Sequence, residues 1–399
     1  MSWETMKLSE CCFSIADGDH LPPPKSESGI PFVTISNINA TNQFDFTNTM
    51  FVPQEYYDRL DSKRKAQVGD VLYSVVGSFG IPVYIKENQK FVFQRHIAIL
   101  RPNEKILPRF LYYTMLSRDF YAKADAAAIG AAQRTVSLTA LRNIEIDVPT
   151  IEEQRKIVDM LSAYDDLIEN NQKQIKLLEE AAQRLYKEWF VELRFPGYEN
   201  TPIIDDAPQG WRIDEVKSIV SLLSGYAFKS NDFVERGKYK IVTIKNVQDG
   251  SFDGENVNTI AEIPSKMPRH CILNDGDILL SLTGNVGRVC LVNGKDYLLN
   301  QRVAKLDSKY PAYAYCLFRN KDMFDIMNNL ANGAAQQNLS PIRTENVRIL
   351  IPSDGLIQKF EDVVSPMISK ILLLNKTNDN LKQARDRLLP KLMSGELEV

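Results

Sequence analysis

The stretch from Ile157 to Trp189 constrains the fold of this chain most, because its apolar residues recur at steps of four and three. This spacing is typical of a coiled-coil seam, and Glu, Lys, Gln, Asp and Arg fill the positions between the seam residues. About 33 residues at roughly 1.5 Å each form a helix about 50 Å long. A helix of this kind needs a partner that covers its apolar seam.

A second stretch, from Phe360 to Leu392, has the same spacing and can supply that partner. Each stretch carries one seam asparagine, Asn171 in the first and Asn378 in the second. An antiparallel pairing of these two places apolar residues opposite apolar residues, with Tyr164 against Arg385 as the exception. A buried polar pair costs stability but penalises other registers, so we predict an antiparallel coiled coil. The alternative is two independent amphipathic helices, each packed on its own domain. The predicted helix–helix seam consists of Ile157, Leu161, Ile168, Asn171, Ile175, Leu178 and Leu185 with Val364, Ile371, Leu374, Asn378, Leu381 and Leu388.

Short motifs recur in the same order in the two halves of the chain, which indicates an internal duplication. The matching pairs are Val33–Ile38 with Val242–Val247, Gly69–Leu72 with Gly276–Leu279, Gln94-Arg95 with Gln301-Arg302, and Gly130–Gln133 with Gly333–Gln336. Their offset changes only slightly along the chain, as expected of a duplicated unit with small loop deletions. The chain is therefore predicted to be a tandem of two units, each a globular part followed by a long helix.

The length of 399 residues suits two domains plus connectors. We predict an α+β fold with globular domains at residues 1–150 and 211–353 and helical segments at 151–195 and 354–399. Residues 196–210 contain Pro, Gly and acidic residues without a periodic pattern, and they are predicted to form a hinge.

Local patterns predict several elements within this plan. The β-branched run Ile30–Ile38 indicates a strand, and residues 83–85 with 91–93 indicate a hairpin. Residues 108–128 and 310–330 each read as one helix. Pro366 is expected to kink or restart the second long helix, because proline removes a backbone hydrogen bond.

Composition and charge limit the classes of function. The chain has a net charge of −3, and no apolar run approaches the roughly 20 residues that span a bilayer. Five cysteines without metal-type spacing indicate a reducing compartment, and with no signal pattern at the N-terminus we expect a cytoplasmic protein without a membrane partner. Cys11 and Cys12 are predicted to be structural. A chain this close to neutral is not a strong non-specific nucleic-acid binder, so any DNA affinity has to come from local patches or from a basic partner.

The sequence resembles the specificity (S) subunits of type I restriction-modification systems. Pro149–Gln154 followed by Ile157 and Leu161 is similar to the start of the family's long helix, and the repeated Gly-Asp and Gln-Arg motifs are similar to those of its target recognition domains. Further similar segments are Thr283-Gly284 with Gly287, Trp189-Phe190 with Arg194–Gly197, and the C-terminal Lys391–Leu397. The similarity extends over essentially the whole chain. The second helix start, Pro352–Gln358, departs from the pattern because it lacks the Glu-Gln pair and has one extra residue.

The resemblance implies a non-catalytic subunit in which each half reads one part of a split sequence in double-stranded DNA and the long helices set the distance between the halves. It also implies docking of two adenine methyltransferase (M) subunits and up to two restriction (R) subunits. This chain would then bind no cofactor, whereas the partner subunits would use S-adenosylmethionine, ATP and Mg.

The repeated loops contain polar side chains suited to DNA contact, since Arg, Gln, Asn and Lys read base edges and Lys, Arg, Ser and Thr bind phosphates. Residues repeated in both halves are expected to hold backbone or phosphate, because halves that read different sequences should differ where they read bases. The pairs that differ are Ser36 and Lys245, Phe79 and Val286, and Arg134 and Gln337. A second interpretation of Asn37 and Asn246 is that they cap strand ends. The DNA-binding candidates are Lys25, Ser36, Asn37, Ser78, Phe79, Gln94, Arg95, Gln133, Arg134, Lys229, Lys245, Asn246, Thr283, Asn285, Arg288, Gln301, Arg302, Gln336 and Gln337.

No catalytic motif supports an enzyme. The sequence has neither an Asn-Pro-Pro-Tyr/Phe motif for adenine methylation nor a phosphate-binding loop with the spacing of a nucleotide hydrolase. His20, His96 and His270 are not spaced for a metal, so neither a catalytic nor a metal site is predicted. The alternatives left open are a two-domain scaffold that binds only proteins and, as a weaker option, a nuclease built from scattered Asp and Lys.

Overall fold

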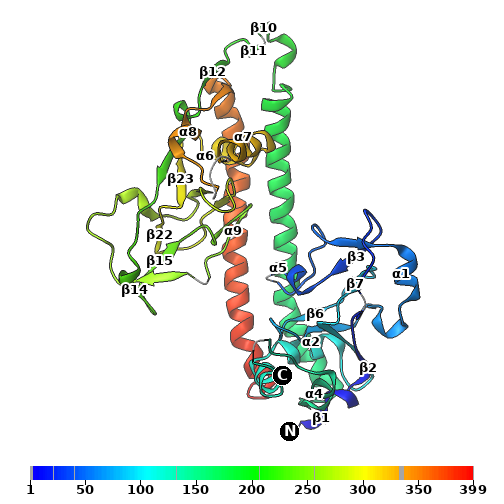
Figure 1. The fold of residues 1–399 in the computed structure, drawn as a ribbon. Coiled ribbons are helices and arrows are strands. Elements are labelled where there is room, and N and C mark those ends of the chain that lie inside the picture. Colours follow the sequence, from blue (N-terminus) through cyan, green and yellow to red (C-terminus); the bar gives the residue numbers. More distant parts are fainter. Residues whose placement is uncertain are drawn as a thin grey trace. The chain divides into compact units, whose positions relative to one another are not determined.

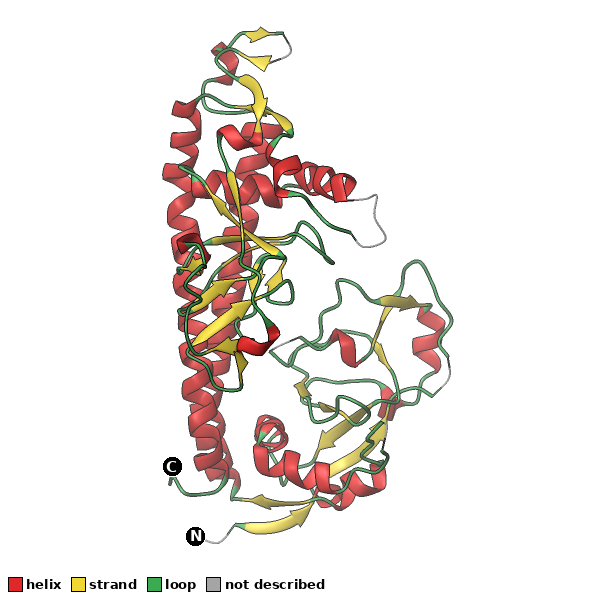
Figure 2. Ribbon diagram, turned by 60° about the vertical axis from the view of Figure 1, so that its left-hand side comes forward, coloured by secondary structure: helices red, strands yellow, loops and turns green. Residues whose placement is uncertain are grey.

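A computed structural model describes residues 3–398 except Leu21, Ala40, Ala132, Asp206, Asn256 and 332–336. The chain divides into two compact units (Figure 1): residues 1–166 with 381–399 form the first unit, and residues 167–380 form the second. Each unit therefore contains a globular part and a portion of both long helices. Strands and helices are mixed in both globular parts, and most strands are short (Figure 2).

Antiparallel and mixed sheets with short helices build the first unit. Its main sheet has the order β2-β8-β5-β6, and a smaller sheet has the order β4-β3-β7. The bounds are β1 Glu4–Lys7, β2 Cys12–Asp17, β3 Ile30–Val33, β4 Met50–Val52, α1 Gln54–Arg59, β5 Val71–Ser74, β6 Pro82–Tyr84, β7 Val92–Phe93, β8 Ile97–Pro102, α2 Pro108–Leu116, α3 Arg118–Ala126, α4 Leu138–Asn143 and β9 Glu145–Val148.

The second unit repeats this plan. Its main sheet, β13-β23-β20-β21, has strands in places equivalent to those of β2-β8-β5-β6. The bounds are β10 Ile203–Ile204, β11 Ala207–Pro208, β12 Arg212–Glu215, β13 Ser221–Ser224, β14 Phe233–Val234, β15 Tyr239–Val242, β16 Val247–Gln248, β17 Ser251–Phe252, β18 Asn258–Ile260, β19 Ile272–Leu273, β20 Ile278–Ser281, β21 Val289–Leu291, β22 Tyr297–Leu299, β23 Val303–Asp307, α6 Pro311–Arg319, α7 Lys321–Ala331, α8 Pro341–Glu345 and β24 Arg348–Ile351. The tandem duplication predicted from the motifs is confirmed.

The hairpin predicted from residues 83–85 and 91–93 is wrong. Strand β6 pairs with β5, whereas β7 pairs in parallel with β3, and the second unit repeats that parallel pairing between β15 and β22. Val92 and Phe93 pack into different apolar clusters. Strand β7 is therefore buried on both faces, and such a strand commonly pairs in parallel with a strand distant in the sequence. A local residue pattern cannot reveal that pairing.

Three predicted elements end earlier than expected. The strand from Ile30 stops at Val33, because the Asn37 side chain accepts a hydrogen bond from the Thr34 backbone N–H (2.9 Å) and closes a 3₁₀ turn. The helix predicted over residues 108–128 breaks at Ser117, whose Oγ caps the next helix by accepting from the Phe120 N–H. The equivalent break in the second unit is at Asn320, whose Oδ1 accepts from the Asp322 N–H.

The two long helices are α5, Ile151–Tyr186, which ends in a π-helical turn at Lys187–Val191, and α9, Asp354–Met393. The predicted restart at Pro366 is wrong, since α9 passes through this residue without interruption. Proline costs one backbone hydrogen bond at this point. The neighbouring Val364 and Ile371 are buried in the apolar core of the second unit, and their burial offsets that loss.

The long helices run antiparallel, as predicted. In the second unit Asn171 Nδ2 donates to Asn378 Oδ1 at 2.8 Å, and both side chains are buried. The rings of Trp189 and Phe360 lie 5.9 Å apart in the same unit. In the first unit Ile157 and Leu161 share an apolar cluster with Leu389 and Leu392. Arg385, the exception in the predicted seam, turns to the neighbouring Asp165 and donates from Nη1 to Oδ1 at 2.7 Å.

Replacing Asn171 alone with leucine is expected to lower the free energy of unfolding by about 1–3 kcal/mol, because the Asn378 amide then stays buried without a partner. Replacing both asparagines with leucine should recover most of that loss, since no desolvated amide remains. Chemical denaturation of the two single variants and the double variant measures this coupling. Strictly additive losses would show that the pair does not act as a unit.

Candidate nucleic-acid interface

The repeated motifs of the first unit converge at one end of the strands of its main sheet. Val75 N–H donates to the His96 carbonyl (2.9 Å), Gly77 N–H donates to the Arg134 carbonyl (3.0 Å), and Arg95 N–H donates to the Asp19 carbonyl (3.0 Å). Loops that are distant in the sequence are thereby joined through their backbones. We call residues 17–19, 77–80, 94–96 and 133–135 the first loop cluster.

The second unit contains an equivalent set. Leu282 N–H donates to the Arg302 carbonyl (3.0 Å), Leu339 N–H donates to the Leu282 carbonyl (2.7 Å), and Gln301 N–H donates to the Tyr226 carbonyl (3.0 Å). Residues 224–226, 283–288, 300–302 and 337–339 form the second loop cluster. The duplication has therefore preserved a way of bringing four polar loops together.

A buried serine in each unit shapes the glycine-containing loop. Ser74 and Ser281 are inaccessible to solvent. Ser74 Oγ accepts from the Ile81 N–H at 2.9 Å, and Ser281 Oγ accepts from the Arg288 N–H at 3.0 Å. The loop between each serine and its N–H donor is thus closed from inside, and its outer residues can vary.

In each unit a glycine lets its own loop approach the backbone next to the Gln-Arg motif closely. A Cβ on Gly18 would lie 2.2 Å from the Phe93 carbonyl oxygen, and a Cβ on Gly225 would lie 2.2 Å from the Asn300 carbonyl oxygen. Real Cβ atoms do not come this close to backbone atoms, so only glycine fits. These glycines were missed in the sequence, although they lie at equivalent places before the two repeats of Val-Thr-Ile.

The repeated Gly-Asp motif supports the main sheet. Asp70 is buried and accepts from Arg101 Nη2 (2.9 Å) and from the Gln67 N–H (2.8 Å). Asp277 pairs with Lys305 Nζ (2.8 Å) and accepts from the Asn274 N–H (2.8 Å). In both units the basic partner comes from the neighbouring strand, β8 or β23. In both units this motif therefore ties two neighbouring strands of the main sheet together.

The side chains of Asn37 and Asn246 hold backbone groups of their own turns, which favours the capping interpretation over a DNA contact. Asn246 is 3% exposed, its Oδ1 accepts from the Thr243 N–H (2.8 Å), and its Nδ2 donates to the Asp253 carbonyl (2.9 Å). Asn37 makes the corresponding contact with Thr34. Both side chains close a turn after a strand, which agrees with the second interpretation of these residues.

Phe79, a predicted candidate for base reading, is buried against Tyr121 and leaves little of its ring exposed. The two rings are stacked with centroids 5.6 Å apart, and the Arg134 guanidinium lies over Phe79 at 5.8 Å. Arg134 also pairs with Asp125. Tyr121 is 46% exposed, but it was not among the predicted DNA-binding candidates because it lies in the apolar pattern of a helix.

The remaining candidates divide by exposure. Gln94, Thr283 and Arg288 are partly buried, and Arg288 donates to Gln248. Gln336 lies outside the described residues. The exposed candidates are Lys25, Ser36, Ser78, Arg95, Gln133, Arg134, Lys229, Lys245, Asn285, Gln301, Arg302 and Gln337.

Each globular part is attached to a long helix by a buried side chain that caps a helix N-terminus. Gln154 of α5 accepts from the Leu107 N–H (2.7 Å) at the start of α2. Glu361 of α9 accepts from the N–H groups of Ala312 (2.9 Å) and Tyr313 (3.1 Å) at the start of α6. The second helix start thus lacks the Glu-Gln pair in sequence, but Glu361 supplies the same support about one turn later.

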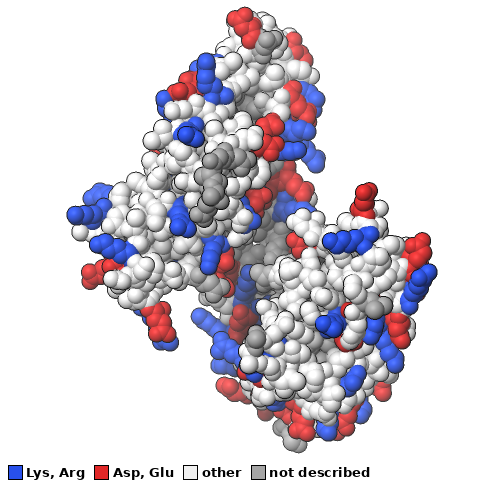
Figure 3. Space-filling model, viewed as in Figure 1, with Lys and Arg blue, Asp and Glu red and all other residues white. Residues whose placement is uncertain are grey.

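Charge and chemistry limit what these surfaces can do. Basic and acidic side chains are interspersed over the face drawn in Figure 3, without a large region of one sign.

Among the described residues, no cluster of three or more His, Cys, Asp or Glu side chains could hold a metal ion. Within the same part of the chain, no helix has the length and apolar character to cross a membrane. All five cysteines are buried, and burial raises the pKa of the Cys12 thiol to about 12, which agrees with a structural role.

The fold and these loops define a tandem-repeat protein whose two halves present equivalent clusters of polar loops and share an antiparallel helical coil. The chain belongs to the family described as the type I restriction modification DNA specificity domain, which matches residues 2–180 and 208–383. Membership in this family supports a role in DNA sequence specificity.

Similar proteins agree with this assignment. The chain is 30% identical over 310 residues to the type I restriction enzyme MjaIX specificity subunit of Methanocaldococcus jannaschii, covering 75% of this chain and 71% of that protein. It is 21% identical to the type I restriction enzyme HindI specificity subunit of Haemophilus influenzae, covering 92% of this chain and 95% of that protein. The crystal structure of a type I restriction-modification S subunit from M. genitalium has the same fold, with a TM-score of 0.56 at 16% identity, covering 98% of this chain and 96% of that one.

Proposed function

We propose that this chain is the DNA-reading subunit of a type I restriction-modification complex and that each half reads one part of a split target. The observation that carries this proposal is the pair of equivalent loop clusters, which share their internal supports but differ in exposed side chains. Residues 1–150 and 211–353 are the two target recognition domains, residues 151–195 and 354–399 are the helical spacers, and residues 196–210 are the linker.

Base reading is assigned to exposed positions that differ between the halves. Ser36 corresponds to Lys245, Ser78 to Asn285, and Arg134 to Gln337, and all of these side chains are exposed. Arg and Lys can make paired contacts to guanine and Asn and Gln can make them to adenine, whereas Ser is less selective. The repeated Arg95 and Arg302 are assigned to phosphates, which carry no sequence information and can therefore be contacted alike by both halves.

Membership in the family supports the proposed partners. The chain docks two adenine methyltransferase subunits and up to two restriction subunits, and these use S-adenosylmethionine, ATP and Mg. The chain itself is non-catalytic, binds no cofactor and acts in the cytoplasm. A protein-only scaffold and a nuclease remain the competing functions, and neither has a specific observation in its favour.

The test is a methylome of cells that express this chain with its methyltransferase, compared with cells that express the methyltransferase alone. We expect adenine methylation at a split motif only when this chain is present. Exchange of residues 1–150 for those of a relative should change one half of the motif and leave the other half unaltered. If the assembled complex leaves the DNA unmethylated, the scaffold function is favoured.

A further inference from the structure

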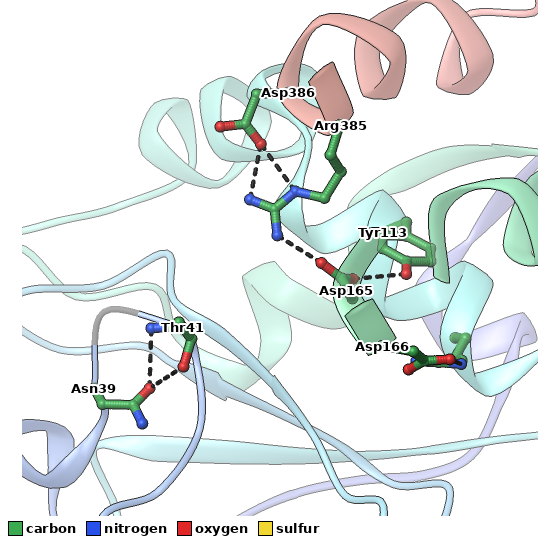
Figure 4. A network of polar contacts seen from close by, with 8 residues as sticks. Asn39, Thr41, Tyr113, Asp165, Asp166, Arg385 and Asp386 are labelled. Carbon is green, nitrogen blue, oxygen red and sulfur yellow. Dashed lines mark hydrogen bonds and ion pairs between the residues drawn. The ribbon is translucent and has the colours of Figure 1, made fainter. Parts of the chain in front are cut away.

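A carboxylate in the first unit connects three helices. Tyr113 Oη of α2 donates to Asp165 Oδ2 of α5 at 2.7 Å, and Arg385 Nη1 of α9 donates to Asp165 Oδ1 at 2.7 Å (Figure 4). Both oxygens of one carboxylate are used, one by the globular part and one by the partner helix. We call Tyr113, Asp165 and Arg385 the first triad.

The second unit has a triad of the same chemistry. Tyr315 Oη of α6 donates to Glu179 Oε1 of α5 at 2.9 Å, and Arg319 Nη1 lies 3.0 Å from the same carboxylate oxygen. Arg319 Nη1 also donates to Tyr315 Oη at 2.8 Å. The turn at Gly250 covers this second triad closely, since a Cβ on that residue would lie 2.6 Å from Arg319 Nη2.

Both triads are mostly shielded from solvent. The exposed fractions are 15% for Asp165, 18% for Arg385, 17% for Glu179 and 13% for Arg319. Burial raises the pKa of both tyrosine hydroxyls, so they stay protonated and remain donors at neutral pH. Charge-assisted hydrogen bonds are stronger and more directional than apolar contacts.

Apolar packing alone allows small rotations of a globular part on a helix, because dispersion contacts are weak and numerous. A tyrosine hydroxyl fixed on a carboxylate removes that freedom at one defined point. The arginine in turn holds the carboxylate in place. In the first triad this arginine, Arg385, comes from the opposite long helix. Each triad therefore adds a second directional contact, beside the cap from Gln154 or Glu361, that fixes how its recognition domain is oriented on the helices.

We propose that the two triads are positioning residues that make the complex discriminate between DNA spacers of different length. This inference rests on the proposed function, since it concerns where the two loop clusters meet the same duplex. A recognition domain that can rotate on its helices would accept half-sites displaced by one base pair. Sequence reading within each half-site would not change, because the loop clusters are untouched.

The experiment uses the assembled complex with the methyltransferase. Binding is measured to duplexes that carry the native spacer or a spacer one base pair shorter or longer. For Tyr113→Phe and Tyr315→Phe we expect the preference for the native spacer to fall about tenfold, the factor corresponding to one lost hydrogen bond to a charged group. Asp165→Asn should act in the same direction as Tyr113→Phe.

Asp386→Asn is the matched control. Asp386 also accepts from Arg385, but it lies on the same helix and is 59% exposed. Within the part of the chain that the structure describes, Asp386 makes no hydrogen bond to the globular part. This variant should keep the native preference. Loss of one hydroxyl leaves the tyrosine ring in place, so both Tyr→Phe variants are expected to fold.

Equal weakening at all three spacers, or an unchanged preference, would overturn the inference while leaving the proposed function intact. Failure of the unaltered complex to recognise any split motif would overturn the proposed function and this inference with it. A wider spacer distribution in the methylome of the Tyr→Phe variants, at unchanged half-site sequences, would support the inference independently.

Discussion

Replacing Asp70 with alanine is expected to lower the free energy of unfolding by about 3 kcal/mol, because Arg101 loses its partner and the Gln67 N–H loses its acceptor. Asp70 is only 2% exposed, so water cannot take its place without rearrangement of the sheet. Since domains are stable by only about 5–15 kcal/mol, this loss removes a large share of the stability of the first half. Chemical denaturation of the purified variant measures the change.

Asp277→Ala is the matched comparison in the second half. Its partner Lys305 is a flexible point charge, whereas Arg101 contacts both oxygens of Asp70 through two nitrogen atoms. The loss should therefore be smaller for Asp277 than for Asp70. The double variant Asp70→Ala/Arg101→Met should be less destabilised than Asp70→Ala, because no unpaired charge remains. Equal stability of Asp70→Ala and the wild type would contradict the structural role of the repeated Gly-Asp motif.

Gly18→Ala is expected to abolish recognition of one half-site. The new Cβ would lie 2.2 Å from the Phe93 carbonyl oxygen and 2.4 Å from the Gln94 carbonyl oxygen, and both are backbone atoms. The turn between β7 and β8 that carries Gln94-Arg95 must therefore move, at a cost of about 3 kcal/mol. The methylome of this variant should lose the half of the motif that is assigned to residues 1–150.

Gly225→Ala should cause the corresponding loss in the other half, because its Cβ meets the Asn300 carbonyl oxygen at the same distance. Gly355→Ala is the control, since a Cβ there meets no atom within 4 Å and the residue lies in α9. Alanine is also the better helix former at that position. If Gly18→Ala retained full methylation of both half-sites, the first loop cluster would not be the reading surface.

The sequence alone was sufficient to predict the duplication and the antiparallel pairing of the long helices. A seam repeats along one helix face, so residue spacing encodes which side chains meet, and one asparagine per helix selects the register. The hydrogen bond between Asn171 and Asn378 joins the two residues that define this predicted register. The loop motifs could also be located, because their order is the same in both halves.

Only the tertiary structure decided what those loop residues do. Asn246 and Asp70 are polar residues in repeated motifs, yet their side chains bind the protein itself. The parallel pairing of β3 with β7 and the support of α6 by Glu361 join segments separated by many residues. Periodicity reports on neighbours along the chain, whereas the partner of a buried polar group comes from wherever the fold brings a second segment close. For this reason the sequence determined the architecture of the protein, and the structure separated the side chains that hold the loops from those that remain exposed to a ligand.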